Sequence, residues 1–177
     1  MASLLAVDLG VRSGLAVYGE DGRLKRYRSV NFGSRGGLKR AAYGVVAEIA
    51  AEDELSWLVA EGDRALAEIW SRLASKRGAR SMQIGAEVWR AQLLFRRERR
   101  SGSDAKQHAD RLAREIIAWS EAPAPTSLRH DAAEAILIGF WGVLEVGWLG
   151  EVPDALARGG LTAQGPFGAV AAGCEVP

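Results

Sequence analysis

The chain has 177 residues, of which 48% are hydrophobic and 25% are charged. This length and composition predict one globular domain and exclude a fibrous or fully disordered chain. The 23 basic and 22 acidic residues give a formal net charge of +1, so the overall charge does not by itself indicate a nucleic-acid partner.

The single cysteine, Cys174, excludes an intrachain disulfide and a zinc site built from cysteines. A reducing, cytoplasmic location is therefore expected. The N-terminus has no basic segment before its short apolar run, which Asp8 ends, so no secretory signal is predicted. The apolar stretch 135–144 is too short for a membrane span, which needs about 20 residues, and predicts a buried helix.

The predicted elements begin with three short strands over 3–7, 14–18 and 24–29, the last two joined by a turn at Asp21-Gly22. Apolar residues at helical spacing predict a helix over about 37–52, followed by a strand over 56–60 and a helix over about 64–76. A fifth strand over 80–86, a basic segment, and helices over about 104–119 and 128–149 complete the series.

This order predicts an α/β fold in which a five-stranded mixed sheet, an antiparallel meander extended by parallel strands, has helices on both faces. Residues 1–150 are expected to form this domain. The segment 151–177 is rich in Gly, Ala and Pro, and it is expected to be a poorly ordered tail.

Four acidic residues are expected at one edge of this sheet. Asp8 ends the first strand and Glu61 ends the fourth, and parallel neighbouring strands would bring both side chains to the edge where open α/β sheets bind ligands. Asp131 and Glu134 are three residues apart and share one face of the last helix. If that helix begins at the same edge, the four carboxylates converge.

Converging carboxylates raise one another's pKa, and a bound cation relieves their repulsion. Ligands made only of oxygen favour Mg²⁺ or Mn²⁺ over zinc. Two such ions on a phosphodiester generate the attacking hydroxide and stabilise the leaving oxygen. The pattern therefore predicts metal-dependent phosphodiester hydrolysis with two Mg²⁺ ions, for which Mn²⁺ can substitute.

Four segments resemble the RuvC family of Holliday junction resolvases, in the RNase H-like (retroviral integrase) superfamily. They are LLAVDLG at 4–10, GLAVY at 14–18, WLVAE at 57–61 and HDAAEA at 130–135, and the resemblance covers roughly residues 3–149. It implies an RNase H-like fold and a crossover junction endodeoxyribonuclease. Such an enzyme is a homodimer that cuts two opposing strands of a four-way DNA junction in recombination and repair.

The resemblance also implies the roles of the four acids: Asp8 bridges two metals, and Glu61, Asp131 and Glu134 complete their coordination. Two features depart from the family pattern. The fourth acid is usually aspartate, whereas Glu134 is one methylene longer. His130 is a candidate for metal binding or proton transfer, because some family members place a histidine in this cluster; the alternative is a polar surface group at a helix start.

Basic residues concentrate in two segments. Residues 23–40 contain seven basic and no acidic side chains, and residues 90–100 contain five arginines and one acid, Glu98. The resemblance implies that the second segment and the start of the next helix contact the junction. The candidate DNA-binding residues are Arg96, Arg97, Arg99, Arg100 and Lys106. The alternative for these arginines is a solvated surface.

Each candidate acid also has an ordinary structural interpretation. Asp8 suits a turn before Gly10, and the segment after Glu61 suits a loop in which Asp63 caps a helix. Asp131 and Glu134 would complement the positive end of a helix dipole. The placement of all four at the expected ends of the expected elements favours a shared site. Glu87 is a competing acid to which the resemblance gives no role.

Other functions stay open. An RNase H-like nuclease acting on RNA, as in the YqgF family linked to ribosomal RNA processing, is the nearest, although the basic insert and the pair of acids on the last helix favour the resolvase. A nucleic-acid binding module without catalysis is the next, and the presence of all four acids argues against it. Sugar kinases and actin-like ATPases share the opening pattern but need about twice this length.

Overall fold

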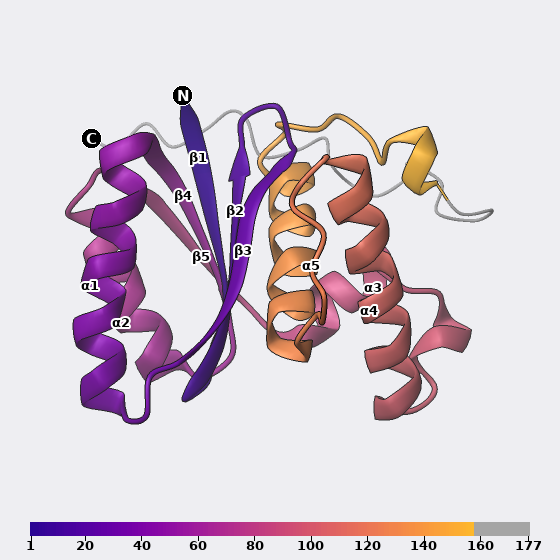
Figure 1. Ribbon diagram of the computed structural model, residues 1–177, viewed down its shortest axis with the longest axis horizontal. Coiled ribbons are helices and arrows are strands. Elements are labelled where there is room, and N and C mark those ends of the chain that lie inside the picture. Colours follow the sequence, from indigo (N-terminus) through magenta and orange to yellow (C-terminus); the bar gives the residue numbers. More distant parts are fainter. Residues whose placement is uncertain (158–177) are drawn as a thin grey trace, which may run out of the picture.

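A five-stranded mixed sheet in the order β3-β2-β1-β4-β5 lies at the centre of the computed structural model, which describes residues 1–157 (Figure 1). β1 (Ala2–Asp8), β2 (Arg12–Gly19) and β3 (Leu24–Asn31) form an antiparallel meander. β4 (Glu54–Glu61) and β5 (Arg80–Ile84) extend it in parallel with β1. The sheet topology predicted from the sequence is confirmed.

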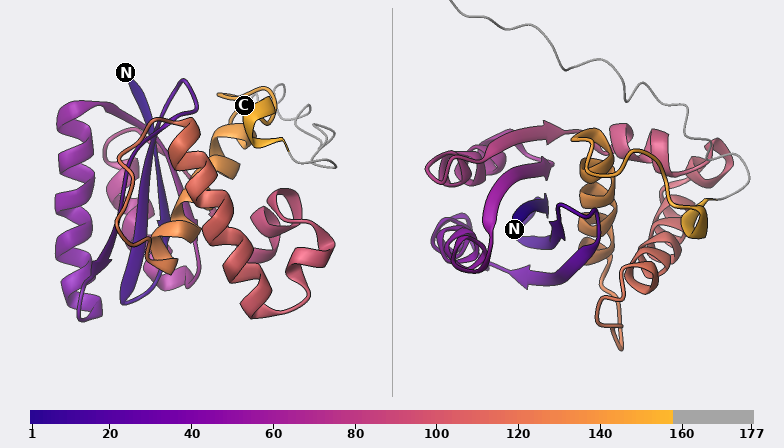
Figure 2. Two further views of the ribbon diagram at one scale, coloured as in Figure 1. Left: turned by 45° about the vertical axis from the view of Figure 1, so that its right-hand side comes forward. Right: turned by 90° about the horizontal axis from the view of Figure 1, so that it is seen from above.

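Helices cover both faces of the sheet, as Figure 2 shows from above. α1 (Arg35–Glu52) and α2 (Arg64–Ser75) lie on one face. α5 (His130–Glu145) lies on the other, with α4 (Gly102–Trp119) and α3 (Ala86–Leu93) packed outside it. Two short 3₁₀ helices, η1 (Arg96–Arg99) and η2 (Asp154–Leu156), complete the described chain.

Helix α3 was not predicted from the sequence. The expected strand over 80–86 stops at Ile84, and Gly85 then precedes a helix whose buried residues, Trp89 and Leu93, are four positions apart. That spacing places both side chains on one helical face. Two apolar residues among several arginines are too few, however, to show a helical pattern in the sequence. The last helix is also shorter than the predicted 128–149: it begins at His130 and ends at Glu145.

Alternating side chains of β1 divide the core into two layers. Leu5 and Val7 point toward α1 and α2, whereas Leu4 and Ala6 point toward α5. Strand β1 is thus buried on both faces, as a central strand between two helical layers must be.

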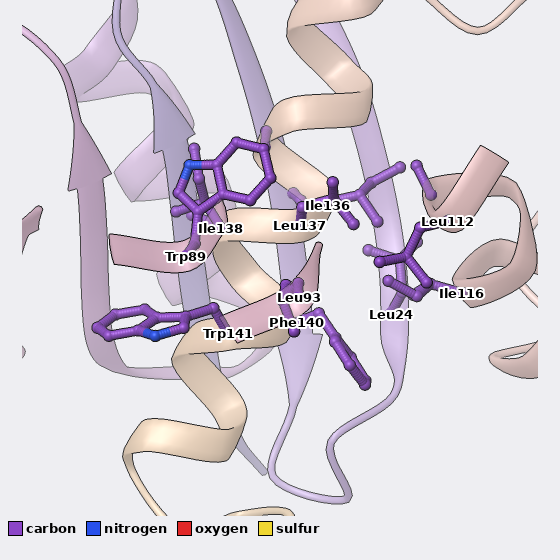
Figure 3. Close-up of a cluster of buried hydrophobic side chains, with 14 of the residues drawn as sticks. Leu24, Trp89, Leu93, Leu112, Ile116, Ile136, Leu137, Ile138, Phe140 and Trp141 are labelled. Atoms are coloured by element: carbon purple, nitrogen blue, oxygen red, sulfur yellow. The ribbon is translucent and has the colours of Figure 1, made fainter. Parts of the chain in front are cut away.

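Helix α5 is the most buried helix, since every residue from Ala132 to Leu144 is buried. Figure 3 shows its Ile136, Leu137, Ile138, Phe140 and Trp141 among the side chains of the α5 layer. The Tyr18 hydroxyl donates a 2.7 Å hydrogen bond to the Ile136 carbonyl and so ties the helix to β2. The prediction of a buried helix here is confirmed. Across residues 1–157, no helix has the length and apolar character that crossing a membrane requires.

The packed structure continues past the predicted boundary at residue 150. Leu156 of η2 is only 2% exposed and belongs to the core layer around α5. Residues 158–177, the remainder of the expected tail, lie outside the described residues.

We predict that Gly139→Ala destabilises the fold by about 1–3 kcal/mol, the usual effect of overpacking a core. An added Cβ would lie 2.3 Å from Cε2 of Tyr18, a ring held by its hydrogen bond to α5. Chemical denaturation measures the effect. The matched control is Gly44→Ala at an exposed position of α1, where no atom lies within 4 Å of the new methyl and a gain of about 0.5–1 kcal/mol is expected. Equal effects of the two substitutions would contradict the tight docking of α5.

Candidate active site

Asp8 and Glu61 are side by side at the ends of adjacent parallel strands. They are register partners in the β1–β4 pairing, and the Leu9 amide continues the ladder with a 2.9 Å hydrogen bond to the Glu61 carbonyl. Both side chains therefore lie at the carboxyl edge of the sheet. This placement was predicted from the sequence and is confirmed.

The N-terminus of α5 docks at the same edge because Gly14 leaves room for it. Gly14 is the partner of Asp8 on β2, and a Cβ at this position would lie 1.8 Å from the Asp131 carbonyl oxygen. Any side chain there would push α5 away from Asp8. The Ser29 hydroxyl on β3 donates a 2.5 Å hydrogen bond to Oδ2 of Asp131 and fixes this carboxylate.

Glu134 is buried near the same edge, with 9% of the residue exposed, and it has two basic neighbours. Arg90 on α3 donates to its Oε1 at 2.5 Å, and Nε2 of His130 lies 3.4 Å from its Oε2. His130 is half-buried beside a candidate metal ligand, which is where the hypothesis of a metal or proton-transfer role requires it.

Helix α3 contributes two consecutive residues to the site that the sequence analysis missed. The indole Nε1 of buried Trp89 donates to Oε2 of Glu61 at 3.1 Å, and Arg90 engages Glu134. The Arg90 guanidinium carbon lies 5.0 Å from the Trp89 ring centroid, and its buried Nε has no hydrogen-bond partner among residues 1–157. The four-residue spacing of Trp89 and Leu93 is the signal that could have predicted this helix, and with it the position of Trp89 and Arg90 beside the acids.

Burial and repulsion shift the ionisation of the strand-end acids. The pKa of Asp8 rises from its ordinary 3.8 to about 8, first because the carboxyl is buried and then because of the charges on Glu134, Glu61 and Asp131. Burial is also the main cause that raises the pKa of Glu61, while the Trp89 hydrogen bond opposes the rise and the charge of Glu134 adds to it. The four acids therefore interact electrostatically as one cluster.

The donor set fits a hard divalent cation, because it consists of carboxylate oxygens whose mutual repulsion a cation would relieve. The side chains are not arranged around an ion. Across residues 1–157, no group of three or more His, Cys, Asp or Glu side chains is placed to hold one. Instead, protein donors engage three of the four acids: Trp89 on Glu61, Ser29 on Asp131 and Arg90 on Glu134.

Two further acids of the sequence analysis, Asp63 and Glu87, have the roles expected of ordinary structure. Asp63 caps α2 by accepting a 3.0 Å hydrogen bond from the Leu66 amide. Glu87 lies in the first turn of α3, where its charge contributes to the raised pKa of Glu61.

The two basic segments differ in how their charges are paired. In the first, Lys25, Arg26 and Arg28 form ion pairs with Asp53, Glu52 and Glu48 around the end of α1. The candidate DNA-binding residues of the second segment and of the start of α4 are all exposed: Arg96, Arg97, Arg99, Arg100 and Lys106. Four of them line a surface hollow of about 530 Å³, namely Arg96, Arg97, Arg99 and Arg100.

Two solved structures resemble this fold. RuvC of T. thermophilus in complex with Holliday junction substrate superposes with a TM-score of 0.58 at 17% identity, over 83% of this chain and 96% of that one. The chain has the RuvC fold. A second RuvC structure from Thermus thermophilus matches with a TM-score of 0.54 at 17% identity, over 80% of this chain and 96% of the other.

The RuvC-like fold confirms the α/β class and the RNase H-like sheet expected from the resemblance. A comparison with protein-family models finds no match, and neither does a comparison with curated protein sequences. The likeness is thus carried by the arrangement of elements, since sequence identity is low.

The raised pKa of Asp8 predicts a stability that falls with pH in the absence of divalent cations. Between about pH 4 and pH 8 the folded carboxyl keeps a proton that the unfolded chain releases, so the free energy of unfolding decreases as pH rises and levels off above pH 8. Glu61, whose pKa is also raised, adds to the same trend. Melting temperatures measured in EDTA across this range test it.

The control for this prediction is Asp8→Asn, which removes the titrating group and should flatten the decline while stabilising the metal-free protein at neutral pH. Parallel pH profiles of the variant and the unmodified protein would show that Asp8 is not the titrating group.

Proposed function

We propose that this protein is a metal-dependent endonuclease that cleaves four-way DNA junctions, acting as a homodimer with two Mg²⁺ ions in each active site. The observation that carries the proposal is that β1, β4 and α5 bring four carboxylates to one sheet edge, where burial and then repulsion from the other three acids raise the pKa of Asp8 to about 8. The RuvC fold supports a nuclease of this kind.

In this proposal, the four acids share the binding of the metals. Asp8, Glu61 on the neighbouring strand and the Asp131–Glu134 pair on α5 would together hold the two ions. The bound ions would supply an activated water and stabilise the leaving oxygen of the phosphodiester. His130 lies beside Glu134, at a place where it can exchange a proton or add a nitrogen ligand.

The chain's own residues restrain these acids before any cation binds. Trp89 and Ser29 fix the orientation of Glu61 and Asp131, which lowers the cost of ordering them. Arg90 partly neutralises the cluster, because its charge lowers the pKa of both Asp8 and Glu61. For Glu134 to hold a cation, the Arg90 guanidinium would have to leave Oε1 of Glu134, or the cation would have to bind Oε2 while Arg90 stays on Oε1.

A nucleic-acid binding module without catalysis is the second candidate, and one observation favours it. Arg90 already provides a positive charge within the acid cluster through its 2.5 Å contact with Glu134. If that ion pair replaces the cation permanently, the protein keeps its fold and its exposed arginines but cannot hydrolyse a phosphodiester.

Binding of divalent cations separates these candidates. Millimolar Mg²⁺ or Mn²⁺ should raise the melting temperature, with a stabilisation of about 1.4 kcal/mol when the metal is at ten times its Kd. Asp8→Asn should abolish this response. The control is Asp63→Asn, which keeps a good helix cap outside the acid cluster and should leave the response intact. No metal response in the unmodified protein would favour the binding module.

Cleavage assays test the proposed activity itself. The unmodified protein with Mg²⁺ should place paired, symmetric nicks in a labelled four-way junction and leave a linear duplex and an RNA–DNA hybrid uncut, and Asp8→Asn should be inactive. Cutting of the hybrid or of RNA would transfer the function to RNA processing. The absence of cutting by folded, metal-bound protein would contradict a nuclease.

A further inference from the structure

We propose that Glu98, an acidic residue among four arginines, is the positioning residue that shapes the arginine turn (residues 95–100) into a binding site for the phosphate backbone of a nucleic acid. The choice of ligand rests on the proposed function, whereas the role of Glu98 rests on its own contacts. Glu98 is only 3% exposed, while the arginines on both sides of it are exposed.

The first group of contacts closes the turn on itself. Oε2 of Glu98 accepts a 3.1 Å hydrogen bond from the Phe95 amide, and the Glu98 amide donates to the Phe95 carbonyl at 2.9 Å. This reciprocal pair satisfies the Phe95 and Glu98 amide N–H groups at the start of η1 and fixes the conformation of the segment that carries the arginines.

The second group of contacts attaches the turn to α4. Oε1 of Glu98 accepts from Nη2 of Arg111 at 3.0 Å and lies 3.2 Å from Nδ1 of His108. A carboxylate so deeply buried is tolerated only with such partners, and loss of its charge would leave Arg111 without this partner. The turn is thereby held against a long helix by one side chain.

With Glu98 turned inward, the four flanking arginines turn outward and line the surface hollow. The Arg97 guanidinium carbon lies 5.2 Å from the Phe95 ring centroid, which restrains this side chain. Within residues 1–157, none of the four guanidinium groups forms an ion pair with a carboxylate, unlike Arg26 and Arg28 of the first basic segment. They are thus available to an external anion.

The ligand class follows from charge and location. Several guanidinium groups in a fixed arrangement match a run of phosphates better than a single carboxylate, because each forms directional, charge-assisted hydrogen bonds. The turn also follows α3, whose Arg90 contacts Glu134, and in Figure 1 it lies toward the same lower side of the molecule as the N-terminus of α5. A nucleic acid at the acid cluster can therefore extend toward the turn.

The decisive test is Glu98→Gln, because two accounts predict opposite results for it. Simple electrostatics predicts tighter binding when a negative charge is removed from a basic surface. If Glu98 positions the turn, binding weakens, because the arginines lose their common arrangement and must be ordered by the ligand. Binding to a labelled four-way junction and to a duplex is measured in EDTA over a range of salt concentrations, well below the melting temperature.

We expect about a tenfold rise in Kd for Glu98→Gln, together with a shallower dependence of log Kd on log salt, because fewer phosphates are contacted. A general loss of stability does not change that slope. The matched control is Asp104→Asn, which removes one negative charge at the start of α4 without touching the contacts of Glu98, and its Kd should be equal or lower. Glu98→Gln that binds as tightly as this control would overturn the proposal.

If Glu98→Gln fails to fold by circular dichroism, His108→Gln loosens the same anchor from α4 and carries the same expectation, and an unchanged Kd and salt slope for it would overturn the proposal. The results separate this inference from the nuclease. If Glu98→Gln binds DNA more weakly but the unmodified protein cuts no DNA, the result supports the positioning role of Glu98 and contradicts the proposed nuclease activity. If the unmodified protein binds neither the four-way junction nor the duplex, the proposal that the arginine turn binds a phosphate backbone is contradicted as well.

Discussion

Repulsion among carboxylates that the fold forces together is the constraint on which the rest of the site depends. Asp8 and Glu61 are register partners at the end of two parallel strands, and α5 brings Asp131 and Glu134 to the same edge. Burial and these neighbouring charges raise the pKa of Asp8 to about 8, so the arrangement costs folding free energy when no cation is bound. Packing must offset that cost.

Helix α5 provides that packing. Its residues from Ala132 to Leu144 are buried, and two glycines permit its close approach to the sheet: Gly139 on the helix beside Tyr18, and Gly14 on β2 beside the Asp131 carbonyl. The same contact therefore stabilises the fold and delivers two carboxylates to the sheet edge. Donors from α3 and β3 then hold three of the acids, and they occupy oxygens that a cation would use.

The sequence predicted the parts of this site that depend on backbone topology. Asp8 and Glu61 follow apolar strand segments, and the Asp131–Glu134 spacing fixes a shared helical face, so their convergence required only the sheet order. Arg90 and Trp89 could not be placed in this way, because their roles arise from α3, a short helix with only two buried residues in a basic segment. The role of Glu98 could not be predicted either, because its buried carboxylate contacts Arg111 and His108, which lie thirteen and ten positions further along the chain.

The proposed function requires that the four carboxylates bind a divalent cation in spite of the Arg90 contact with Glu134. The most direct measurement is anomalous X-ray scattering at the manganese edge from crystals soaked in Mn²⁺. We expect anomalous peaks in contact with carboxylate oxygens of Asp8, Glu61 and the α5 acids. We also expect the Arg90 side chain to have moved away from Oε1 of Glu134 or to share that carboxylate with the ion. A site without anomalous density, in which Arg90 keeps its contact with Glu134 at saturating Mn²⁺, would contradict it.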